Sequence, residues 1–346
     1  MSNYSFGRFR LNKINLVSKT KCLTAWAIMN CRRRLFAAAS AAFAFLLLQS
    51  WPPPDNVAAA APSADAAAGR HNLFLWRVTG SKGTVFLLGS VHLGSTDLFP
   101  LPQEIEQAFR STDYLVEEVD PKQQDPAAAR QFWVAHGRYT DGDRLENHIS
   151  ENTKMALGIY LQLTGRPATA FSSAKPWLAS LLINRQELRH YGFSGKQGID
   201  QHFAEEAAAS RKPVIGLETP DYQMNLLYWR FSTLPDEAQD KMLLSTILHA
   251  QTAARHLGAL IQAWRNGDAA AVAALNANNS PDPQSQFYFD EIFSKRNLRM
   301  AQQIQVYLKT PYTYFVVVGA GHLVGSRGIV ELLQEQGYGV DQMSTR

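Results

Sequence analysis

The sequence predicts an α/β fold, with a central mixed sheet built from two pseudo-repeated halves, helices on both faces and a mainly helical insertion. Three observations support this prediction. Short runs of β-branched, Leu and aromatic residues alternate with longer segments of helical periodicity. An apolar run that leads into Gly-x-x-His-Leu occurs near each end of the body, at 85–93 and at 316–323. The 46% hydrophobic content suits a packed core and argues against a disordered chain.

Residues 1–61 are predicted to be a targeting segment ahead of the fold. Three consecutive arginines, Arg32 to Arg34, precede an apolar run at 35–48, which is shorter than the about 20 residues of a membrane span. This pattern is typical of a signal peptide, and an uncleaved N-terminal anchor that tethers the chain to the membrane through 35–48 is the alternative. Met29 directly precedes the arginines, so an alternative start there would make the first 28 residues an extension of the gene model.

Residues 62–70 continue an Ala- and Pro-rich stretch and are predicted to be a linker. The body, which we take as residues 71–342, follows this linker. Either form of the N-terminal segment directs the body out of the cytoplasm, so we expect a periplasmic or secreted protein.

Charge and cysteine content limit the classes of function. The net charge is +4, but the excess of basic residues lies in the N-terminal segment, and 26 basic and 29 acidic residues remain from Pro62 onward. We therefore expect no nucleic-acid partner. Both cysteines, Cys22 and Cys31, precede the body, which excludes a disulfide framework, a cysteine zinc site and a thiol nucleophile within it.

The body begins with a strand-rich stretch. Apolar runs at 73–78 and 84–88 flank a Gly-Ser-Lys-Gly turn, which predicts a β-hairpin. A short helix is expected over 103–110, after Pro102, and a buried strand over 114–119.

The region of about 124–210 is predicted to be the helical insertion, because apolar residues recur in it at a spacing of three to four. Its expected helices are 124–136, 151–163, 176–189 and 198–209. Such an insertion could serve as a lid or as a surface for a partner, and its pattern fits either role.

The rest of the body returns to alternating strands and helices. We expect strands at 214–217, 313–318 and 338–340, helices at about 219–274, 288–308 and 327–336, and a turn or surface loop at 276–286.

Two histidines are the first candidates for chemistry. His92 and His322 each follow a predicted strand in a Gly-x-x-His turn, and ligands of open α/β sheets collect outside the carboxyl ends of strands. Two such turns on neighbouring strands would bring both imidazoles to one ion or substrate, and neutral imidazole is a common metal ligand. For either copy alone, the alternative is a histidine hydrogen-bonded at a strand end.

Acidic side chains supply the third member of this candidate site. Alternation along the strand 114–119 puts Glu118 and Asp120 on one face and Glu117 on the other, with solvated acids at a strand end as the alternative. Glu218 follows another strand, and its alternative is a charge that favours the N-terminus of the next helix.

Arg296 and Asn297 lie in the helix before the last long strand. An arginine there could bind a carboxylate or phosphate, and a surface or ion-paired arginine is the alternative. The sequence contains no G-x-S-x-G elbow, Walker loop, H-E-x-x-H or dinucleotide-binding fingerprint.

The order of these motifs resembles the TraB/GumN family over about residues 71–342. The shared segments are 89–94, 99–102, 118–120, 198–200, 212–214, 217–219, Trp264 with 267–268, 296–297 and 318–325. The resemblance implies a fold similar to that of the erythromycin-esterase-like and haem-uptake ChaN-like proteins. It also implies kinship with the Tiki proteins, which are membrane-tethered metalloproteases that depend on manganese or cobalt.

By this resemblance, His92, His322 and Glu118 form the active centre and bind a divalent metal, with manganese or cobalt expected first and zinc as an alternative. Ser90 departs from the threonine of many relatives but keeps a hydroxyl group.

The leading hypothesis for function is a metal-dependent, peptidase-like hydrolase that acts on a peptide or protein. Glu118 would bind the ion or act as general base, while Glu218, Arg296 and Asn297 would orient the substrate. One alternative is a metal-independent hydrolase that uses histidine as its base. Another is a non-catalytic periplasmic factor in polysaccharide production or export. The sequence does not indicate an oligomeric state.

Overall fold

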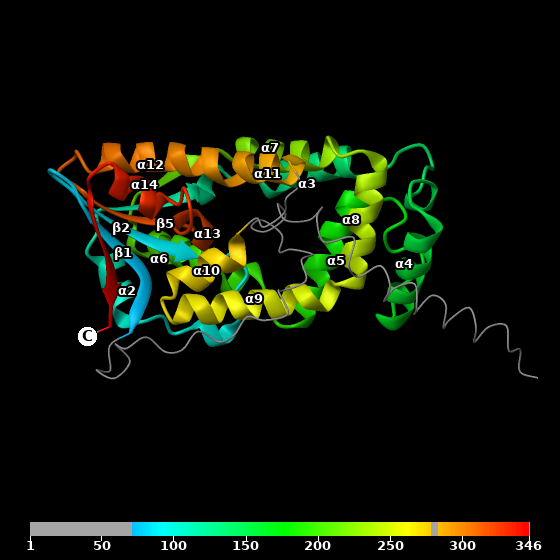
Figure 1. Ribbon diagram of the computed structural model, residues 1–346, viewed down its shortest axis with the longest axis horizontal. Helices are drawn as coiled ribbons and strands as arrows, with labels where there is room; N and C mark the ends of the chain where they lie inside the picture. Colours follow the sequence, from blue (N-terminus) through cyan, green and yellow to red (C-terminus); the bar gives the residue numbers. More distant parts are fainter. Residues whose placement is uncertain (1–70, 278–282, 346) are drawn as a thin grey trace, which may run out of the picture. The chain divides into compact units, whose positions relative to one another are not determined.

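A computed structural model describes residues 71–277 and 283–345 of the chain. Within these ranges, six strands form one mixed sheet with helices packed around it (Figure 1), so the predicted α/β class is confirmed. The strands are β1 (Asn72–Thr79), β2 (Thr84–Ser90), β3 (Tyr114–Val119), β4 (Val214–Glu218), β5 (Thr313–Gly319) and β6 (Gly339–Ser344).

The order of the strands across the sheet is β4-β3-β5-β2-β1-β6. The four strands from β4 to β2 are parallel, whereas β1 runs antiparallel to both of its neighbours. In the register, Ser90 of β2 pairs with Gly319 of β5, and Val119 of β3 pairs with Glu218 of β4. The carboxyl ends of the four parallel strands therefore meet at one edge of the sheet.

The helices account for most of the described residues. They are α2 (Gln103–Arg110), α3 (Pro126–Gly137), α4 (Glu151–Leu163), α5 (Pro176–His190), α6 (Ile199–Ser210), α7 (Pro220–Ser232), α8 (Asp236–Leu248), α9 (Ala250–Arg265), α10 (Ala269–Asn276), α11 (Pro283–Phe289), α12 (Lys295–Tyr307), α13 (Ala320–Leu323) and α14 (Ile329–Glu335).

One expected helical stretch is subdivided, and one expected loop is shorter than predicted. The helical stretch expected over about 219–274 consists of four helices, α7 to α10, with Pro235 at the N-cap of α8 and Gly267, at φ +62°, just beyond the C-terminal end of α9. The expected loop at 276–286 is shorter than predicted, because Pro283 starts α11.

Helices cover both faces of the sheet, as adjacent residues of β5 show. The Phe315 ring packs against Phe109 of α2 and Phe203 of α6, while the Tyr314 ring on the opposite face stacks on Tyr307 of α12. Apolar side chains of these helices and of the strands form the main hydrophobic core. This core holds the strand ends in fixed positions.

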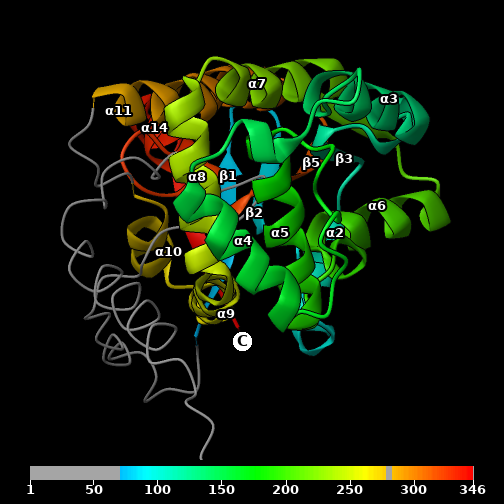
Figure 2. The same cartoon turned by 90° about the vertical axis from the view of Figure 1, so that its right-hand side faces the viewer.

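A second core lies among the helices that follow β3. It includes residues of α4, α5 and α8, and within it the Trp177 ring stacks on the Phe231 ring with centroids 5.4 Å apart. Figures 1 and 2 show these helices grouped beyond the carboxyl edge of the sheet. The helix α6 also falls within the predicted insertion of about 124–210, but its buried residues Ile199, Phe203 and Ala207 belong to the main core.

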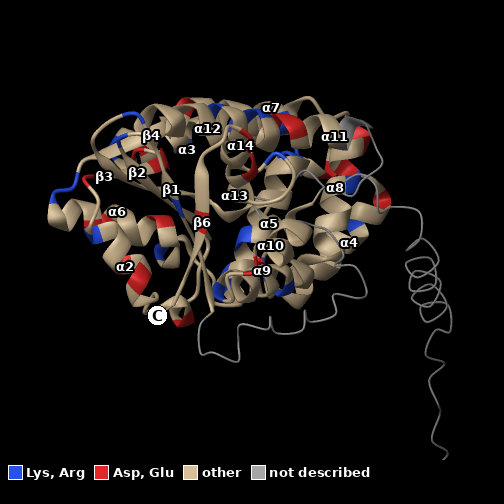
Figure 3. Cartoon of the chain, turned by 60° about the vertical axis from the view of Figure 1, so that its left-hand side comes forward, with Lys and Arg blue, Asp and Glu red and all other residues tan. Residues whose placement is uncertain are grey.

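The predicted targeting segment 1–61 and linker 62–70 lie outside the described residues. Among the helices that are described, none has the length and apolar character that crossing a membrane requires. Basic and acidic residues are interspersed along these helices (Figure 3), and the absence of a nucleic-acid partner stays a prediction.

Candidate functional site

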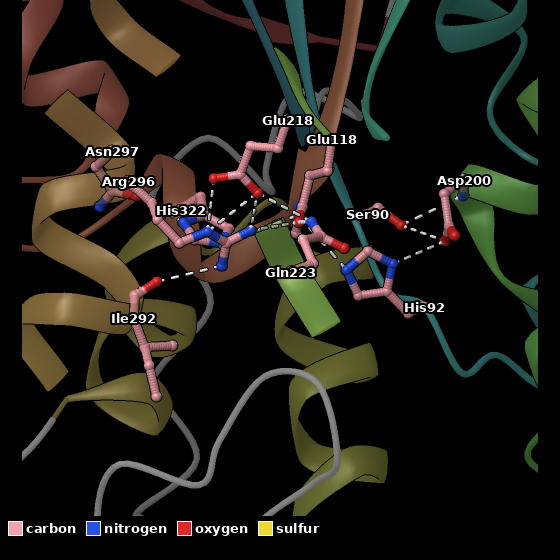
Figure 4. Close-up of polar contacts among 11 residues, drawn as sticks. Ser90, His92, Glu118, Asp200, Glu218, Gln223, Ile292, Arg296, Asn297 and His322 are labelled. Carbon is pink, nitrogen blue, oxygen red and sulfur yellow. Dashed lines mark hydrogen bonds and ion pairs between the residues drawn. The ribbon is translucent and has the colours of Figure 1, made fainter. Parts of the chain in front are cut away.

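The four parallel strands bring the predicted polar residues to one edge of the sheet (Figure 4). His92 follows β2, Glu118 is in β3, Glu218 ends β4, and His322 is in the short helix α13 that follows β5. The two Gly-x-x-His turns lie at the same level because β2 and β5 are neighbours and Ser90 pairs with Gly319. The sequence expectation that both turns reach one acidic side chain agrees with this geometry.

Glu118 is the carboxylate that both histidines approach. Its Oε1 accepts a hydrogen bond from the backbone N–H of Gly319 at 2.8 Å and lies 3.6 Å from His92 Nε2 and 3.9 Å from His322 Nε2. Its Oε2 accepts from Arg296 Nη2 at 2.8 Å. Burial alone would raise the pKa of Glu118, but the Arg296 guanidinium outweighs it and holds the pKa well below the ordinary value.

Arg296 is the cation at the centre of the site, although it is only 1% exposed. Its Nε and Nη2 donate to Glu218, Nη2 also donates to Glu118, and Nη1 donates to the Ile292 carbonyl and to His322 Nε2. All five N–H groups of the guanidinium therefore have acceptors. Arg296 is ion-paired, as one of the two sequence hypotheses expects, and the ion pairs are at the site itself.

A π-helical turn, η7 (Asp290–Ser294), precedes Arg296 and connects α11 to α12. This wider turn contains Ile292, whose carbonyl accepts from Arg296 Nη1 at 3.2 Å. Turns of this kind occur often at functional sites.

His322 is held as a neutral imidazole. Its Nδ1 lies 2.6 Å from Asn297 Oδ1, which can only accept, so Nδ1 carries the proton and Nε2 accepts from Arg296 Nη1 at 3.1 Å. Burial and the adjacent guanidinium lower the pKa of His322 to about 3. Asn297 in turn donates to the Arg327 carbonyl at 2.9 Å, which fixes the amide.

His92 has the opposite environment. Its side chain is 29% exposed, and Nδ1 lies 3.2 Å from Asp200 Oδ1 while Nε2 faces Glu118. Burial acts to lower the pKa of His92, but Asp200 and Glu118 outweigh it and raise the pKa well above the ordinary value. Ser90 Oγ donates to Asp200 at 2.7 Å, so the hydroxyl kept at this position orients the carboxylate.

Close packing of two backbone segments positions Asp200 beside His92. Gly94 forms backbone hydrogen bonds with Ser194, and the Ile199 N–H donates to the Val91 carbonyl at 3.2 Å. A Cβ at Gly198 would lie 2.6 Å from the His92 carbonyl oxygen, so only glycine permits this approach.

The sequence predictions did not include two residues that contact the site. Asp200 stands in the first turn of α6, and Gln223 of α7 donates to both Glu118 and Glu218 at 3.0 Å. Asp200 had one sequence signal, namely its place in the Gly-Ile-Asp segment shared with the family. Gln223 had none, because only the packing of α7 brings it to the sheet edge.

Glu117 projects from the opposite face of β3, as the alternation predicts. Its Oε1 is buried and has no hydrogen-bond partner within the described ranges. Burial, with Asp200 nearby, raises the pKa of Glu117 to about 8, so the side chain is largely a neutral carboxylic acid at pH 7.

The three predicted metal ligands, His92, Glu118 and His322, meet only part of what a divalent ion requires. The donor types suit an ion, because two imidazoles converge on one carboxylate oxygen. The arrangement does not, since Arg296 already donates to His322 Nε2 and to Glu118. No group of three or more His, Cys, Asp or Glu within 71–277 and 283–345 is arranged to hold a metal. The metal-ligand roles of His92, Glu118 and His322 stay a prediction.

The three residues predicted to orient the substrate all lie at this site. Arg296 and Asn297 are buried, and the Glu218 side chain is 6% exposed. Each uses its polar atoms in contacts within the protein, and a role in substrate binding stays a prediction for all three.

The chain is 29% identical to the uncharacterized protein YbaP of Escherichia coli over 248 residues, which cover 72% of this chain and 87% of YbaP. It is 22% identical to a metalloprotease TIKI homolog of Nematostella vectensis over 320 residues, covering 78% of this chain and 67% of the relative. Metalloprotease TIKI1 of Danio rerio is also 22% identical, over 78% of this chain and 63% of its own length.

No solved structure matches the chain. The model of the TraB/PrgY/gumN family matches residues 74–342, which include every strand of the sheet except the first two residues of β1 and the last two of β6, and every residue of the polar site. The chain therefore belongs to the TraB/PrgY/gumN family.

Proposed function

We propose that this chain is a peptidase-like hydrolase that acts on peptides or proteins outside the cytoplasm, and that His92 is its proton-transfer residue. One observation carries the proposal: His92 is the accessible imidazole of a polar centre whose glutamates, arginine and second histidine are buried. The names of the TIKI relatives favour hydrolysis. The signal-peptide pattern in 1–61 favours the compartment.

Hydrolysis of a peptide bond needs a base that takes a proton from water and an acid that protonates the leaving amine. Because its pKa is raised, His92 is mostly an imidazolium near neutral pH, and its neutral form becomes the major one at higher pH. That neutral form would take the water proton at Nε2 as the oxygen bonds to the scissile carbonyl carbon. It would then donate that proton to the amine nitrogen as the C–N bond breaks. Asp200 would keep the other ring proton on Nδ1 and stabilise the imidazolium formed between these steps.

The buried residues act as positioning residues in this proposal. Arg296 keeps Glu118 ionised and forms an ion pair with Glu218, and the ionised Glu118 faces His92 Nε2 at 3.6 Å. His322 and Asn297 hold the guanidinium in line with both carboxylates. Because all five guanidinium N–H groups are engaged, this arrangement favours support of Glu118 over direct contact with the substrate.

The relatives' printed names favour a second, metal-dependent form of the same activity, with manganese or cobalt as the ion and zinc as the alternative. This form requires Arg296 to release His322 Nε2, which the ion would need as a ligand. No step in the reaction above passes through an ion.

The test uses the purified full chain with unfolded casein and a fluorogenic peptide library, after exhaustive chelation and again after addition of Mn²⁺, Co²⁺ or Zn²⁺. We expect cleavage that survives chelation and is lost in His92→Ala. His202→Ala is the matched control, since His202 is 25% exposed and also pairs with a carboxylate, Glu106, at 2.8 Å.

Each other outcome favours a different hypothesis. Cleavage that appears only with added metal supports the metal-dependent form. If folded protein cleaves nothing under any condition and His92→Ala still complements a deletion strain, the hydrolase proposal is wrong and a non-catalytic periplasmic role is favoured.

A further inference from the structure

Arg230, near the C-terminal end of α7, is a buried cation in which two of the three guanidinium nitrogens have no acceptor among the residues that the structure describes. The residue is 4% exposed, and its Nε and Nη1 have no hydrogen-bond partner among the described residues. Its guanidinium lies on the ring of Tyr288, with Cζ 3.9 Å from the ring centroid. Buried polar groups in folded proteins are nearly all hydrogen-bonded, so this exception needs a physical reason.

The contrast with Arg296 shows what is missing around Arg230. Both guanidiniums are buried, but Arg296 contacts two carboxylates and uses all its N–H groups. Burial lowers the pKa of Arg230 to about 10, and the Tyr288 hydroxyl opposes this only partly. The described residues around Arg230 therefore offset only part of the cost of burying this charge.

Arg230 also faces the same side of α7 as a residue of the polar centre. Gln223, which donates to Glu118 and Glu218, precedes it by seven residues, or about two turns. Seven residues of helix rise about 10.5 Å, and an extended peptide advances about 3.3 Å per residue. A peptide that reaches from the polar centre to Arg230 would thus span about three residues.

We propose that Arg230 anchors an anion subsite that binds the carboxylate of a peptide ligand about three residues from the bond at His92. The free N–H groups at Nε and Nη1 supply the donors, and guanidinium is suited to carboxylate. The carboxylate comes from an acidic side chain or from the chain terminus. The placement of the cleaved bond rests on the proposed function, whereas the binding of the carboxylate does not.

Binding at a residue that is 4% exposed requires its neighbours to move apart. Trp229 packs on Tyr288 with ring centroids 5.4 Å apart, so its fluorescence should change when a ligand separates Arg230 from that ring. The chain has seven tryptophans, and a Trp229→Phe variant identifies the part of the signal that comes from this position.

The experiment measures binding of four acetylated tripeptides to the full chain by calorimetry and tryptophan fluorescence. The probes are triglutamate with a free or an amidated C-terminus, and triglutamine with a free or an amidated C-terminus. We expect at least tenfold tighter binding of peptides that carry a carboxylate, and loss of that preference in Arg230→Met. Amidated triglutamate carries carboxylates only on its side chains, and triglutamine with a free C-terminus carries one only at its terminus. Comparison of these two peptides shows which source supplies the anion.

Arg299→Met is the matched control, because Arg299 also lies over a tyrosine ring, that of Tyr222 at 4.9 Å, but is exposed. Since the charge of Arg230 is only partly compensated, Arg230→Met is expected to keep or raise the urea unfolding midpoint, whereas a purely structural arginine would lower it. Equal binding of all four peptides, or an unchanged preference in folded Arg230→Met, overturns the proposal.

If Arg230→Met does not fold, the four peptides are compared on the wild-type chain, where equal binding of all four overturns the proposal. Preferential binding without any cleavage would support the subsite and count against the hydrolase. Cleavage at the same rate with or without carboxylates in the peptide would support the hydrolase and count against the subsite.

Discussion

The two Gly-x-x-His turns are alike in sequence and in position but differ in nearly every physical property. Both follow neighbouring parallel strands, and the last residues of those strands pair directly. His92 is partly exposed between two carboxylates, whereas His322 is buried between an arginine and an asparagine. The pKa of His92 is raised and that of His322 is lowered to about 3.

The difference comes from residues far from either turn in the sequence. Asp200 from α6 reaches His92, and Arg296 and Asn297 from α12 reach His322. The motif therefore sets where an imidazole lies, and the helices packed on each turn set its charge. One turn is suited to exchanging protons with a bound molecule, and the other to holding a buried guanidinium in place.

The strongest test of this comparison exchanges each histidine for alanine. We expect His92→Ala to lower kcat/KM for peptide cleavage by about 10²–10⁴-fold, with less than about 1 kcal/mol lost in the free energy of unfolding. His322→Ala should cost about 1–3 kcal/mol of stability, because Arg296 Nη1 loses its acceptor. If His322→Ala matches His92→Ala in both activity and stability, the two histidines have equivalent roles and the proposed difference between the turns is wrong.

The second test removes the buried cation. Arg296→Met leaves Glu118 and Glu218 without their partner and should lower the free energy of unfolding by about 3–5 kcal/mol in urea titrations. The exposed Arg299→Met should change it by no more than about 0.5 kcal/mol. A loss below about 1 kcal/mol for Arg296→Met would mean that the guanidinium does not hold the centre together.

The third test alters what holds His92 charged. The negative Asp200 favours the imidazolium, so Asp200→Asn should lower the pKa of His92. The base form would then be present at lower pH, and the rising limb of kcat/KM against pH would move in that direction. NMR titration of the His92 ring measures the shift without any substrate. An unchanged pKa would leave Glu118 as the dominant neighbour, and Asp97→Asn, at an exposed acid, controls for net charge.

The fourth and smallest test asks what burial by itself does to the pKa of a histidine. Burial lowers the pKa of His256 in α9 from 6.5 to about 4. The unfolded chain therefore takes up this proton first as pH falls, and stability is present above about pH 6.5 and lost on the way down to pH 4. Urea titrations at pH 7 and pH 4.5 measure how much the free energy of unfolding falls between these two pH values. His256→Leu should make this fall smaller by up to about 3 kcal/mol. An unchanged pH dependence would indicate that His256 is not the group that titrates.

Strand and turn patterns allowed much of the fold and the site to be predicted. His92, Glu118, Glu218 and His322 all stand at strand ends, where alternation and glycine turns are visible in the sequence. Asp200 and Gln223 stand at the beginnings of helices, and nothing in a helical pattern tells which helix ends at the sheet edge. The pairing of Arg296 was one of two hypotheses, since its acceptors come from β3 and β4.

The helix boundaries show the same limit. Helical periodicity continues through 219–274, and the proline at 235 is a local signal for one break. Gly267 also meets a distant segment, since a Cβ there would lie 2.2 Å from the Asn72 carbonyl oxygen. That approach joins segments almost two hundred residues apart, which no local pattern can reveal.

The central position of β5 has a consequence for how the chain matures. This strand lies between β3 and β2 in the sheet, yet about 200 residues of the chain separate β3 from β5. Newly made β2 and β3 thus keep open edges until the last tenth of the polypeptide emerges, a state prone to aggregation that calls for chaperone protection. A chain truncated before Thr313 would lack the strand that joins the two early pieces, so truncation abolishes the assembled centre outright rather than weakening it.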